Sequence, residues 1–419
     1  MKATRRLLAV CALLAGPVLA EEGGVKVSGN MEVWGYGSTL GRISDSPFNP
    51  NNRVADLPSV QWTAETRINL RLRHDDTELV LRPRLMQQHN VGNRGESDHG
   101  EAYLTQGFIR QRLGTAWTLT AGRELLTWGP GNFRSPSNPI YFDAGKTNPL
   151  RDVSGVDLAR ISVTEGAFSA TVARVFNDGH LIDKPLPDPV TLAKFDLRGD
   201  STQFSAIAAT GINDAPFFGA FAQATLGDAW LVYGEVGSGR RAHALQANPA
   251  AGWPFMAQTP SPRKTTTLLG ASYTLESGQT FSLEWLHDGH GYRRSESRAV
   301  FTKVDALADA YLAAPGGPMA GLQLRAIGQS LGQAPALLGR DYLALQWQSN
   351  PQESESFWRL NWNANLTDRS HQFTAYYERN LSQCWSAFVV LGAQHGPRDS
   401  EAERLWDRRL SLGFKLFAF

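Results

Sequence analysis

The chain has little cysteine, no excess of either charge and, after its first twenty residues, no long apolar run. Only Cys11 and Cys384 occur among 419 residues, and Cys11 lies in the apolar leader, so the remainder can hold neither a disulfide nor a site built on several cysteines. The formal net charge is +1, which gives no bulk attraction to nucleic acid. We therefore expect no nucleic-acid partner, no metal and no cofactor.

The low hydropathy of the chain excludes one way of crossing a membrane. Mean hydropathy is −0.30, and past the leader no run reaches the roughly 18 apolar residues that a spanning helix needs. Backbone groups left unpaired in hydrocarbon are too costly for an open sheet. A membrane protein of this composition must therefore be a closed β-barrel, in which only alternate residues face lipid.

The first twenty residues have the pattern of a cleavable export signal. Lys2, Arg5 and Arg6 precede an apolar run over residues 7–14, and Val18-Leu19-Ala20 supplies the small residues that signal peptidase requires. The run is too short for a membrane anchor. We expect export, cleavage after Ala20, and one barrel domain over residues 21–419 in the cell outer membrane.

The last residues alternate as an outer-membrane strand would. Apolar side chains occupy every second position of 410–416, and small or polar ones lie between them. The terminal Phe419 is the kind of residue that barrel-assembly machinery recognises, so we expect that machinery as a partner. Phe417 and Phe419 nevertheless fall on the face of Lys415 and not on the lipid face. Either the strand's register slips near its end, or the requirement for a terminal aromatic residue on the lipid face is looser here.

Alternation of the same kind recurs along the chain. In residues 60–73 the apolar side chains all face one way, and four charged ones share the other face, which no packed face of a soluble sandwich would carry. Short polar connections alternate with longer ones, as turns and outer loops do. Eighteen such segments are predicted, at roughly 25–38, 60–73, 77–87, 101–113, 116–128, 156–164, 167–177, 190–198, 201–211, 216–226, 229–237, 265–275, 279–290, 341–349, 355–366, 370–380, 384–394 and 405–418.

The fold class is therefore all-β: a closed antiparallel transmembrane barrel of 18 strands with long extracellular loops. Segments 190–198 and 201–211 have the weakest alternation, so 16 strands is the alternative. A soluble, secreted all-β protein is the other alternative that the alternation permits.

Two long loops stand apart from the strands. Residues 129–155 are rich in Pro, Gly and Asn, and if folded inward they would constrict the lumen with Arg134, Lys146 and Arg151. The alternative is a loop lying on the surface without a specific role. Residues 292–338 show helical spacing on both sides of a Pro-Gly-Gly-Pro break, which predicts a partly helical cap or plug, or else a loop packed on itself without gating.

Arginine dominates the face that alternation turns inward. A positive wall attracts anions and holds carboxylates in bidentate fashion. The alternative is that these arginines pair with glutamates across strands and only hold the barrel together. The lumen candidates are Arg67, Arg71, Arg73, Arg82, Arg84, Arg160 and Arg359.

A catalytic constellation is hard to find. A nucleophile needs a base beside it, and Ser282 with His287 is the one pair that could serve a barrel enzyme acting on lipid. The repeated strings Asp178-Gly179-His180 and Asp288-Gly289-His290 give only a weak hint of a metal at the outer rim.

One stretch resembles a known family. Residues 122–129 read Gly-Arg-Glu-Leu-Leu-Thr-Trp-Gly and are followed by Asn138-Pro139 and Asn148-Pro149, which is similar to outer-membrane barrels of the alginate-export type. The resemblance implies an 18-stranded barrel whose arginine-lined lumen passes anionic polysaccharide or small solutes. It also implies a lumen position for Arg123, provided that a bulge near Gly122 turns that side chain inward.

These observations favour a porin-like or export channel of a Gram-negative outer membrane that passes anionic or polar solutes, acidic saccharides among them, without a covalent step. The alternative is a plugged barrel that serves as a surface assembly or binding protein for polysaccharide or a protein partner. Conductance would separate the two, because a plugged barrel conducts only after its plug is deleted.

Overall fold

The computed structural model describes residues 21–22, 24–43, 45–177, 189–212, 215–240, 262–313, 318–333, 337–350, 352 and 354–418. The expected signal segment 1–20, the Asp178-Gly179-His180 string and Phe419 lie outside these ranges.

The described residues form one antiparallel sheet that closes on itself. The strands are β1 (Glu21–Glu22), β2 (Val25–Arg42), β3 (Val60–His74), β4 (Thr77–Gly92), β5 (Gly95–Leu113), β6 (Trp117–Glu124), β7 (Val156–Glu165), β8 (Phe168–Asn177), β9 (Val190–Arg198), β10 (Thr202–Ile212), β11 (Ala215–Leu226), β12 (Trp230–Gly239), β13 (Lys264–Thr274), β14 (Thr280–Asp288), β15 (Asp341–Gln348), β16 (Ser356–Asn365), β17 (Ser370–Asn380), β18 (Trp385–His395) and β19 (Trp406–Ala418).

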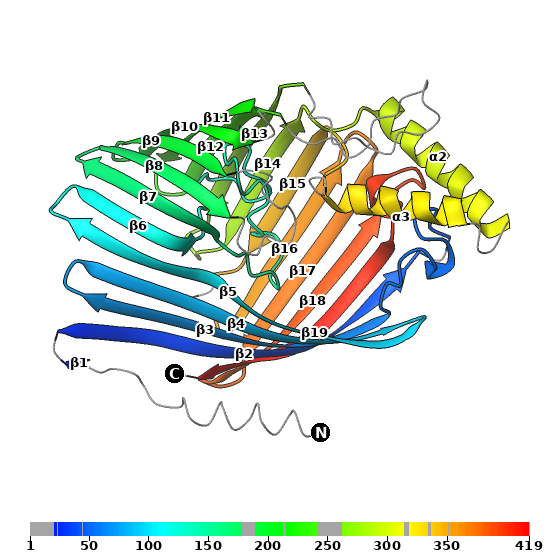
Figure 1. Cartoon of the computed structure of the whole chain (residues 1–419), viewed down its shortest axis with the longest axis horizontal. Helices are drawn as coiled ribbons and strands as arrows, with labels where there is room; N and C mark the ends of the chain where they lie inside the picture. Colours follow the sequence, from blue (N-terminus) through cyan, green and yellow to red (C-terminus); the bar gives the residue numbers. More distant parts are fainter. Residues whose placement is uncertain are drawn as a thin grey trace.

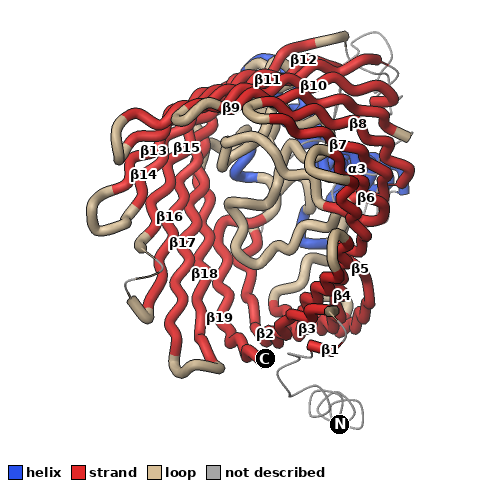
Figure 2. The backbone as a smooth tube through the Cα atoms, turned by 90° about the vertical axis from the view of Figure 1, so that its left-hand side faces the viewer, coloured by secondary structure: helices blue, strands red, loops and turns tan. Residues whose placement is uncertain are grey.

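Each strand from β2 to β19 pairs with its neighbour in sequence, and β19 returns to pair with β2 from Trp406↔Arg42 to Ala418↔Met31. The two-residue β1 pairs antiparallel with the start of β2, Glu21 with Lys26 and Glu22 with Val25. Figure 1 shows the long strands tilted around a common axis, and Figure 2 shows the ring that they enclose. The expected closed barrel of 18 strands is confirmed, and both weakly alternating segments are strands, β9 and β10.

Alternation separates an apolar outer face from a polar inner one. On β19, Leu410, Leu412 and Phe414 are exposed outward, whereas Ser411 and Lys415 are buried inside. The first outward residue after a short turn is often aromatic. This girdle of large rings marks one end of the barrel, here named the turn end, and consists of Trp117, Phe168, Trp230, Phe281, Trp358 and Trp385.

The strand boundaries differ from the expected ones mainly around β5 and β6. The β4–β5 pairing continues through residues 95–100, which the sequence pattern placed in a loop, and ends in a tight turn at Gly92↔Gly95. Asp56 stabilises this turn by accepting hydrogen bonds from the Asn93 and Arg94 amides at 2.8 and 2.9 Å. Residues 125–128, expected in a strand, leave the sheet because the chain turns into the barrel after Glu124.

Two helices lie at the other, loop end of the barrel (Figure 1): α2 (Arg294–Ala313) and α3 (Pro318–Gln333). Their apolar faces pack with loop residues from elsewhere in the chain into a cluster of Phe48, Val54, Val300, Phe301, Val304, Leu307, Leu324, Ile327 and Leu338. The short 3-10 helices η1 (Pro50–Asn52) and η2 (Glu401–Glu403) lie in neighbouring loops. Within the described ranges, no helix combines the length and apolar character needed to cross a membrane.

The end of β19 keeps its register. Its pairing with β18 runs without a shift from Leu416↔Trp385 to Arg408↔Ala393, and Phe417 stays on the face of Lys415. The register slip that the sequence left open is therefore absent from the described part of β19. The irregularity lies at the strand's start, between Trp406 and Arg408.

Candidate functional site: the barrel lumen

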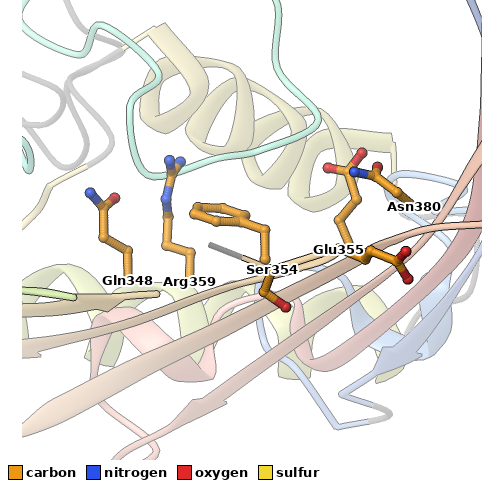
Figure 3. A pocket seen from close by; sticks show the side chains of 7 residues that line it. Gln348, Ser354, Glu355, Arg359 and Asn380 are labelled. Atoms are coloured by element: carbon orange, nitrogen blue, oxygen red, sulfur yellow. The ribbon is translucent and has the colours of Figure 1, made fainter. Parts of the chain in front are cut away.

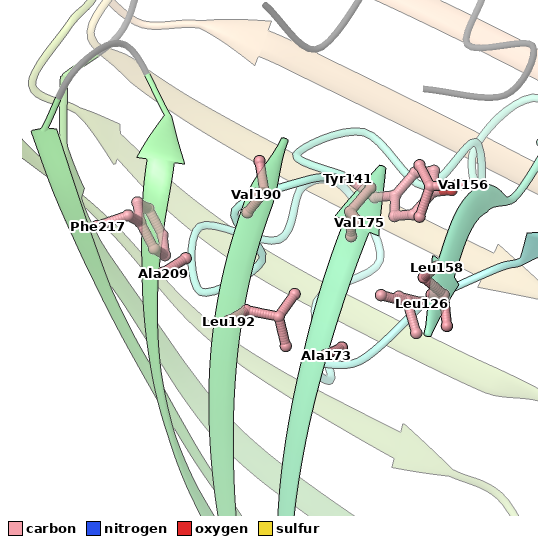
Figure 4. Packing of buried hydrophobic residues seen from close by; sticks show 10 residues of the cluster. All are labelled: Leu126, Tyr141, Val156, Leu158, Ala173, Val175, Val190, Leu192, Ala209 and Phe217. Carbon is pink, nitrogen blue, oxygen red and sulfur yellow. The ribbon is translucent and has the colours of Figure 1, made fainter. Parts of the chain in front are cut away.

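The chain between β6 and β7, residues 125–155, is here named the inner loop. Figure 2 shows loop segments crossing the space inside the ring of strands. The inner loop enters along the wall of β7–β11, where its residues Leu126 and Tyr141 pack against inward side chains (Figure 4). These are Val156, Leu158, Ala173, Val175, Val190, Leu192, Ala209 and Phe217. Burial of this apolar surface fixes the first part of the loop inside the barrel.

The rest of the inner loop reaches the opposite walls. Arg67 on β3 donates a hydrogen bond to the Leu150 carbonyl at 3.2 Å, and Arg84 on β4 contacts the Asp152 carboxylate at 2.5 Å. Arg359 on β16 donates to the Lys146 carbonyl at 3.4 Å. Of the two alternatives for residues 129–155, the structure therefore has the inward one.

The three basic residues expected at the constriction are engaged within the loop. Arg134 is buried, donates to the Phe133 carbonyl and lies 3.6 Å from Asp143. Arg151 lies 3.3 Å from the same carboxylate. Burial acts to raise the pKa of Asp143, but the nearby arginines and a backbone hydrogen bond outweigh it and hold that pKa below its ordinary value. Lys146 donates to the Gly129 and Gly131 carbonyls of the loop at 3.3 and 2.7 Å.

Most of the expected wall arginines are paired with glutamates. Arg71, Arg73 and Arg110 surround Glu78 at 2.8–3.1 Å. Elsewhere on the wall, Arg67 pairs with Glu65 at 2.8 Å, and Arg160 pairs with Glu124 at 2.9 Å. The contacts at Glu78 and Glu124 cross strands, as the pairing alternative proposed, whereas Arg67 and Glu65 lie on the same strand, and the glutamates reduce the positive field of these arginines without cancelling it.

The inward guanidinium groups without an acidic partner among the described residues include Arg82 on β4, Arg359 on β16 and Arg409 on β19. The guanidinium groups of Arg82 and Arg409 make no hydrogen bond in these ranges, and that of Arg359 makes its long contact with the loop and lies 5.4 Å from the Phe357 ring centroid. The Nε atom of Arg359 is buried without a partner. In this described part of the chain, no acid within salt-bridge distance neutralises these three cations.

Arg359 also lines a pocket at the turn end of the lumen. The pocket encloses about 380 Å³, and Figure 3 shows Arg359 and Gln348 side by side, both pointing from the sheet into it. Its lining residues are Gln348, Ser354, Glu355, Phe357, Arg359, Glu378 and Asn380. A cation beside amide groups offers donors to a carboxylate or another small oxyanion.

An aromatic cluster fills the wall next to this pocket. Trp34, Tyr376 and Phe388 are buried on the inner face and are covered by Leu150 of the inner loop. Lys415 lies among their rings, 4.2 Å from the Trp34 centroid, and pairs with Glu378 at 2.6 Å. Leu150 of the inner loop thus covers this apolar part of the lumen wall.

Arg123 requires a correction, because it does not face the lumen. The register of β6 runs without a shift on both sides, and the neighbouring Glu124 is buried inside, so Arg123 points outward. Gly122 takes a φ of +121° but adds no bulge residue. Arg123 instead forms a bidentate pair with Asp157, at 2.7 and 2.9 Å.

The suggested catalytic pair is also separated. Ser282 lies buried inside the barrel and bonds to Ser272, whereas His287 follows the outward Trp285 and contacts Asp341 at 2.8 Å. The two side chains thus face opposite sides of β14, and no proton can pass between them. In the described part of the chain, no three His, Cys, Asp or Glu side chains are grouped as metal ligands would be.

Sequence reasoning missed the importance of Glu235 and undervalued Glu284. Both inward carboxylates accept hydrogen bonds from inner-loop amides. The available signal was an acid at an inward position of a strand without an arginine directly opposite. Glu235 faces Phe221 and Leu268, and Glu284 faces Gly270 and Ala344.

Comparisons with known proteins support the fold. No protein-family model matches the chain, and a search of curated proteins finds no match. Among solved structures, Acinetobacter baumannii OccAB1 is 10% identical over 96% of this chain and 100% of that chain, with a TM-score of 0.54. Pseudomonas aeruginosa OccD3 (OpdP) is 9% identical over 97% and 93%, with a TM-score of 0.52. Pseudomonas aeruginosa OpdQ is 8% identical over 93% and 97%, with a TM-score of 0.51. At these identities the likeness establishes a shared barrel fold.

Proposed function

We propose that the protein is a porin-like outer-membrane channel that passes small anionic or polar solutes. The observation that carries the proposal is the set of three inward guanidinium groups without acidic partners, Arg82, Arg359 and Arg409, inside a barrel narrowed by the inner loop. Their charge lowers the barrier to an anion, and the loop selects by size. Nothing in the arrangement calls for a covalent step.

The test measures the ion selectivity of the purified protein in planar bilayers. Replacing Arg82, Arg359 and Arg409 together by Gln should lower the anion-to-cation permeability ratio. A unit charge acts on an ion about 4 Å away with about 1 kcal/mol in water, which is about fivefold per residue before screening.

The matched control is Arg174→Gln on the outer face of β8, which removes the same charge without touching the lumen. Its selectivity should equal that of the wild type. If the triple variant also keeps the wild-type ratio, these arginines do not set the selectivity and the channel proposal loses its main support.

We propose, more specifically, that the solutes include acidic saccharides and that the protein is related to barrels of the alginate-export type. The Gly-Arg-Glu-Leu-Leu-Thr-Trp-Gly stretch supports the family relationship. The hydrogen-bond donors around Arg359 support the solute class, because they suit a uronate carboxylate. Block of single-channel current by oligouronates, stronger than by neutral oligosaccharides of equal length, is the expected result. Equal block by both would reject this solute class.

We also propose that the protein is exported and then inserted into the outer membrane. The leader supports export and cleavage after Ala20, the apolar outer face with its aromatic girdle fits an outer-membrane bilayer, and Phe419 is offered as the contact with barrel-assembly machinery.

A second candidate function is a plugged barrel that presents its loops to polysaccharide or a protein partner. It is favoured by the α2–α3 pair, which packs on Phe48 and Val54 of the β2–β3 loop and is tied by Arg294 to Asp399 at 2.8 and 2.9 Å. A wild-type protein that conducts only after residues 292–338 are deleted would favour this candidate over an open channel.

A further inference from the structure

Glu235 on β12 acts as a multiple acceptor for the inner loop. Its side chain is 2% exposed, and its Oε1 accepts the Gly131 amide at 2.7 Å. Its Oε2 accepts the hydroxyls of Ser135 and Ser137 at 2.8 and 2.7 Å. Both oxygens of one wall carboxylate are therefore used by the same stretch of loop.

Glu284 on β14 holds the adjoining residues of the loop. It is also 2% exposed, and its two oxygens accept the Asn132 and Phe133 amides at 2.6 and 2.7 Å. Tyr233 donates a further hydrogen bond at 2.6 Å. Three consecutive loop amides, 131 to 133, are thus fixed to two strands of the wall.

The chemistry of these contacts requires carboxylates. Every atom facing Glu235 and Glu284 in these bonds is a donor, so an ionised carboxylate, which only accepts, satisfies all of them. A glutamine of the same shape would turn one NH2 group toward a donor and leave both buried groups unsatisfied. Size and packing alone do not explain an acid at either position.

The counter-charge comes from the loop itself. Among the described residues no cation lies within 4.0 Å of either carboxylate, but Lys146 donates to the Gly131 carbonyl at 2.7 Å, in the peptide unit whose Asn132 amide binds Glu284. Burial lowers the pKa of Lys146, and Glu235 and Glu284 act in the opposite direction. The lysine is thus placed to offset the two buried negative charges.

We infer that Glu235, Glu284 and Lys146 are the positioning residues of the constriction, and we name them the loop clasp. They hold the inner loop across the lumen, so they set the width of the passage. This inference rests on the proposed function only for its electrical readout. The placing of the loop can be measured without any conduction.

The experiment follows a single cysteine in the loop, Ala144→Cys, in the full chain with Cys384→Ser. In folded, detergent-solubilised protein, Glu235→Gln and Glu284→Gln should each raise the labelling rate of this cysteine by a charged maleimide about tenfold. Glu284→Asp should keep part of the protection, because it restores an acceptor-only group. In bilayers the same Gln variants should show noisier, larger currents, and their anion-to-cation ratio should not fall, because each variant removes a negative charge from the lumen.

The matched control is Glu124→Gln, an inward carboxylate that bonds Arg110 and Arg160 and not the loop. Its labelling rate should equal that of the parent. Wild-type labelling rates in both Glu235→Gln and Glu284→Gln would overturn the inference. Faster labelling in a protein that never conducts would support the clasp and reject the channel.

Discussion

Arg123 lies where two strands part. Pairing of β5 with β6 ends at Gly107↔Arg123, and above that point the Leu104 carbonyl accepts a hydrogen bond from the Arg123 guanidinium at 3.1 Å. The same guanidinium binds Asp157 of the next strand. One side chain therefore joins β5, β6 and β7 at the place where the inner loop leaves the wall, and its role is structural.

We expect Arg123→Gln to lower the free energy of unfolding by about 1–3 kcal/mol, because it leaves Asp157 and the Leu104 carbonyl without their donor. Urea unfolding in phospholipid vesicles is the measurement. Arg174→Gln removes an arginine from the same outer face whose hydrogen-bond partner among the described residues is the Thr191 hydroxyl, and it should cost less than about 0.5 kcal/mol. Equal losses in the two variants would refute the joining role.

Which arginines are available to a solute could not be read from the sequence. Alternation placed Arg67, Arg82 and Arg84 on the inner face, but Arg67 and Arg84 bind loop residues some 70–80 positions away in sequence, whereas the Arg82 guanidinium has no acidic partner in the described part of the chain. Strand period fixes the side of the sheet on which a residue lies. It carries no information about the loop that later covers that residue.

The β4–β5 hairpin is the element whose length the sequence pattern understated. Residues 95–100 read Gly-Glu-Ser-Asp-His-Gly, a composition typical of loops, yet they continue the ladder. Asp56 binds the turn from outside, and β3 supports β4 along its whole length. Tertiary contacts thus override local propensity here.

The hydrogen bond from the Arg94 amide, with help from Asn93, lowers the pKa of Asp56 below its ordinary value of 3.8. The stabilisation of the turn is therefore complete above pH 3.8 and is lost as the pH falls through the lowered pKa. Hydrogen exchange of the Asn93 and Arg94 amides, corrected for intrinsic rate, should accelerate in Asp56→Asn at pH 5 and much less at pH 2.5. In Asp98→Asn, which changes the same hairpin without touching its turn, these amides should exchange as in the wild type.

The helices at the loop end were visible in the sequence, and their packing partners were not. Apolar spacing indicated both α2 and α3, but the surface they cover comes from Phe48 and Val54, about 250 residues earlier. Such a contact depends on barrel closure, which brings the β2–β3 and β14–β15 loops to the same end of the molecule.

At the scale of the whole molecule, most of the fold follows from one period-2 pattern. All eighteen segments that alternate are strands of the barrel, because closure allows each strand to bury one kind of face and expose the other. The position of the constriction, in contrast, does not follow from this pattern. The inner loop has no period, and its position depends on Glu235, Glu284 and an apolar wall that come together only in the closed barrel.

Leu412→Lys would place a charge on the outward face near the middle of β19, and we expect it to lower the free energy of unfolding in lipid vesicles by about 2–4 kcal/mol. The control is Gln223→Lys on the inner face of β11, where water is available and the loss should be much smaller. A similar loss at both positions would mean that the outward face does not meet hydrocarbon.

The anchoring of the inner loop has a consequence for the order of assembly. Its contacts reach from β3 to β16, so they cannot all form while the later strands are still being added. The wall must therefore close before its narrowest part is set. A newly inserted molecule would pass through a wide, unselective stage, and it would mature only when the last tethers of residues 125–155 are in place.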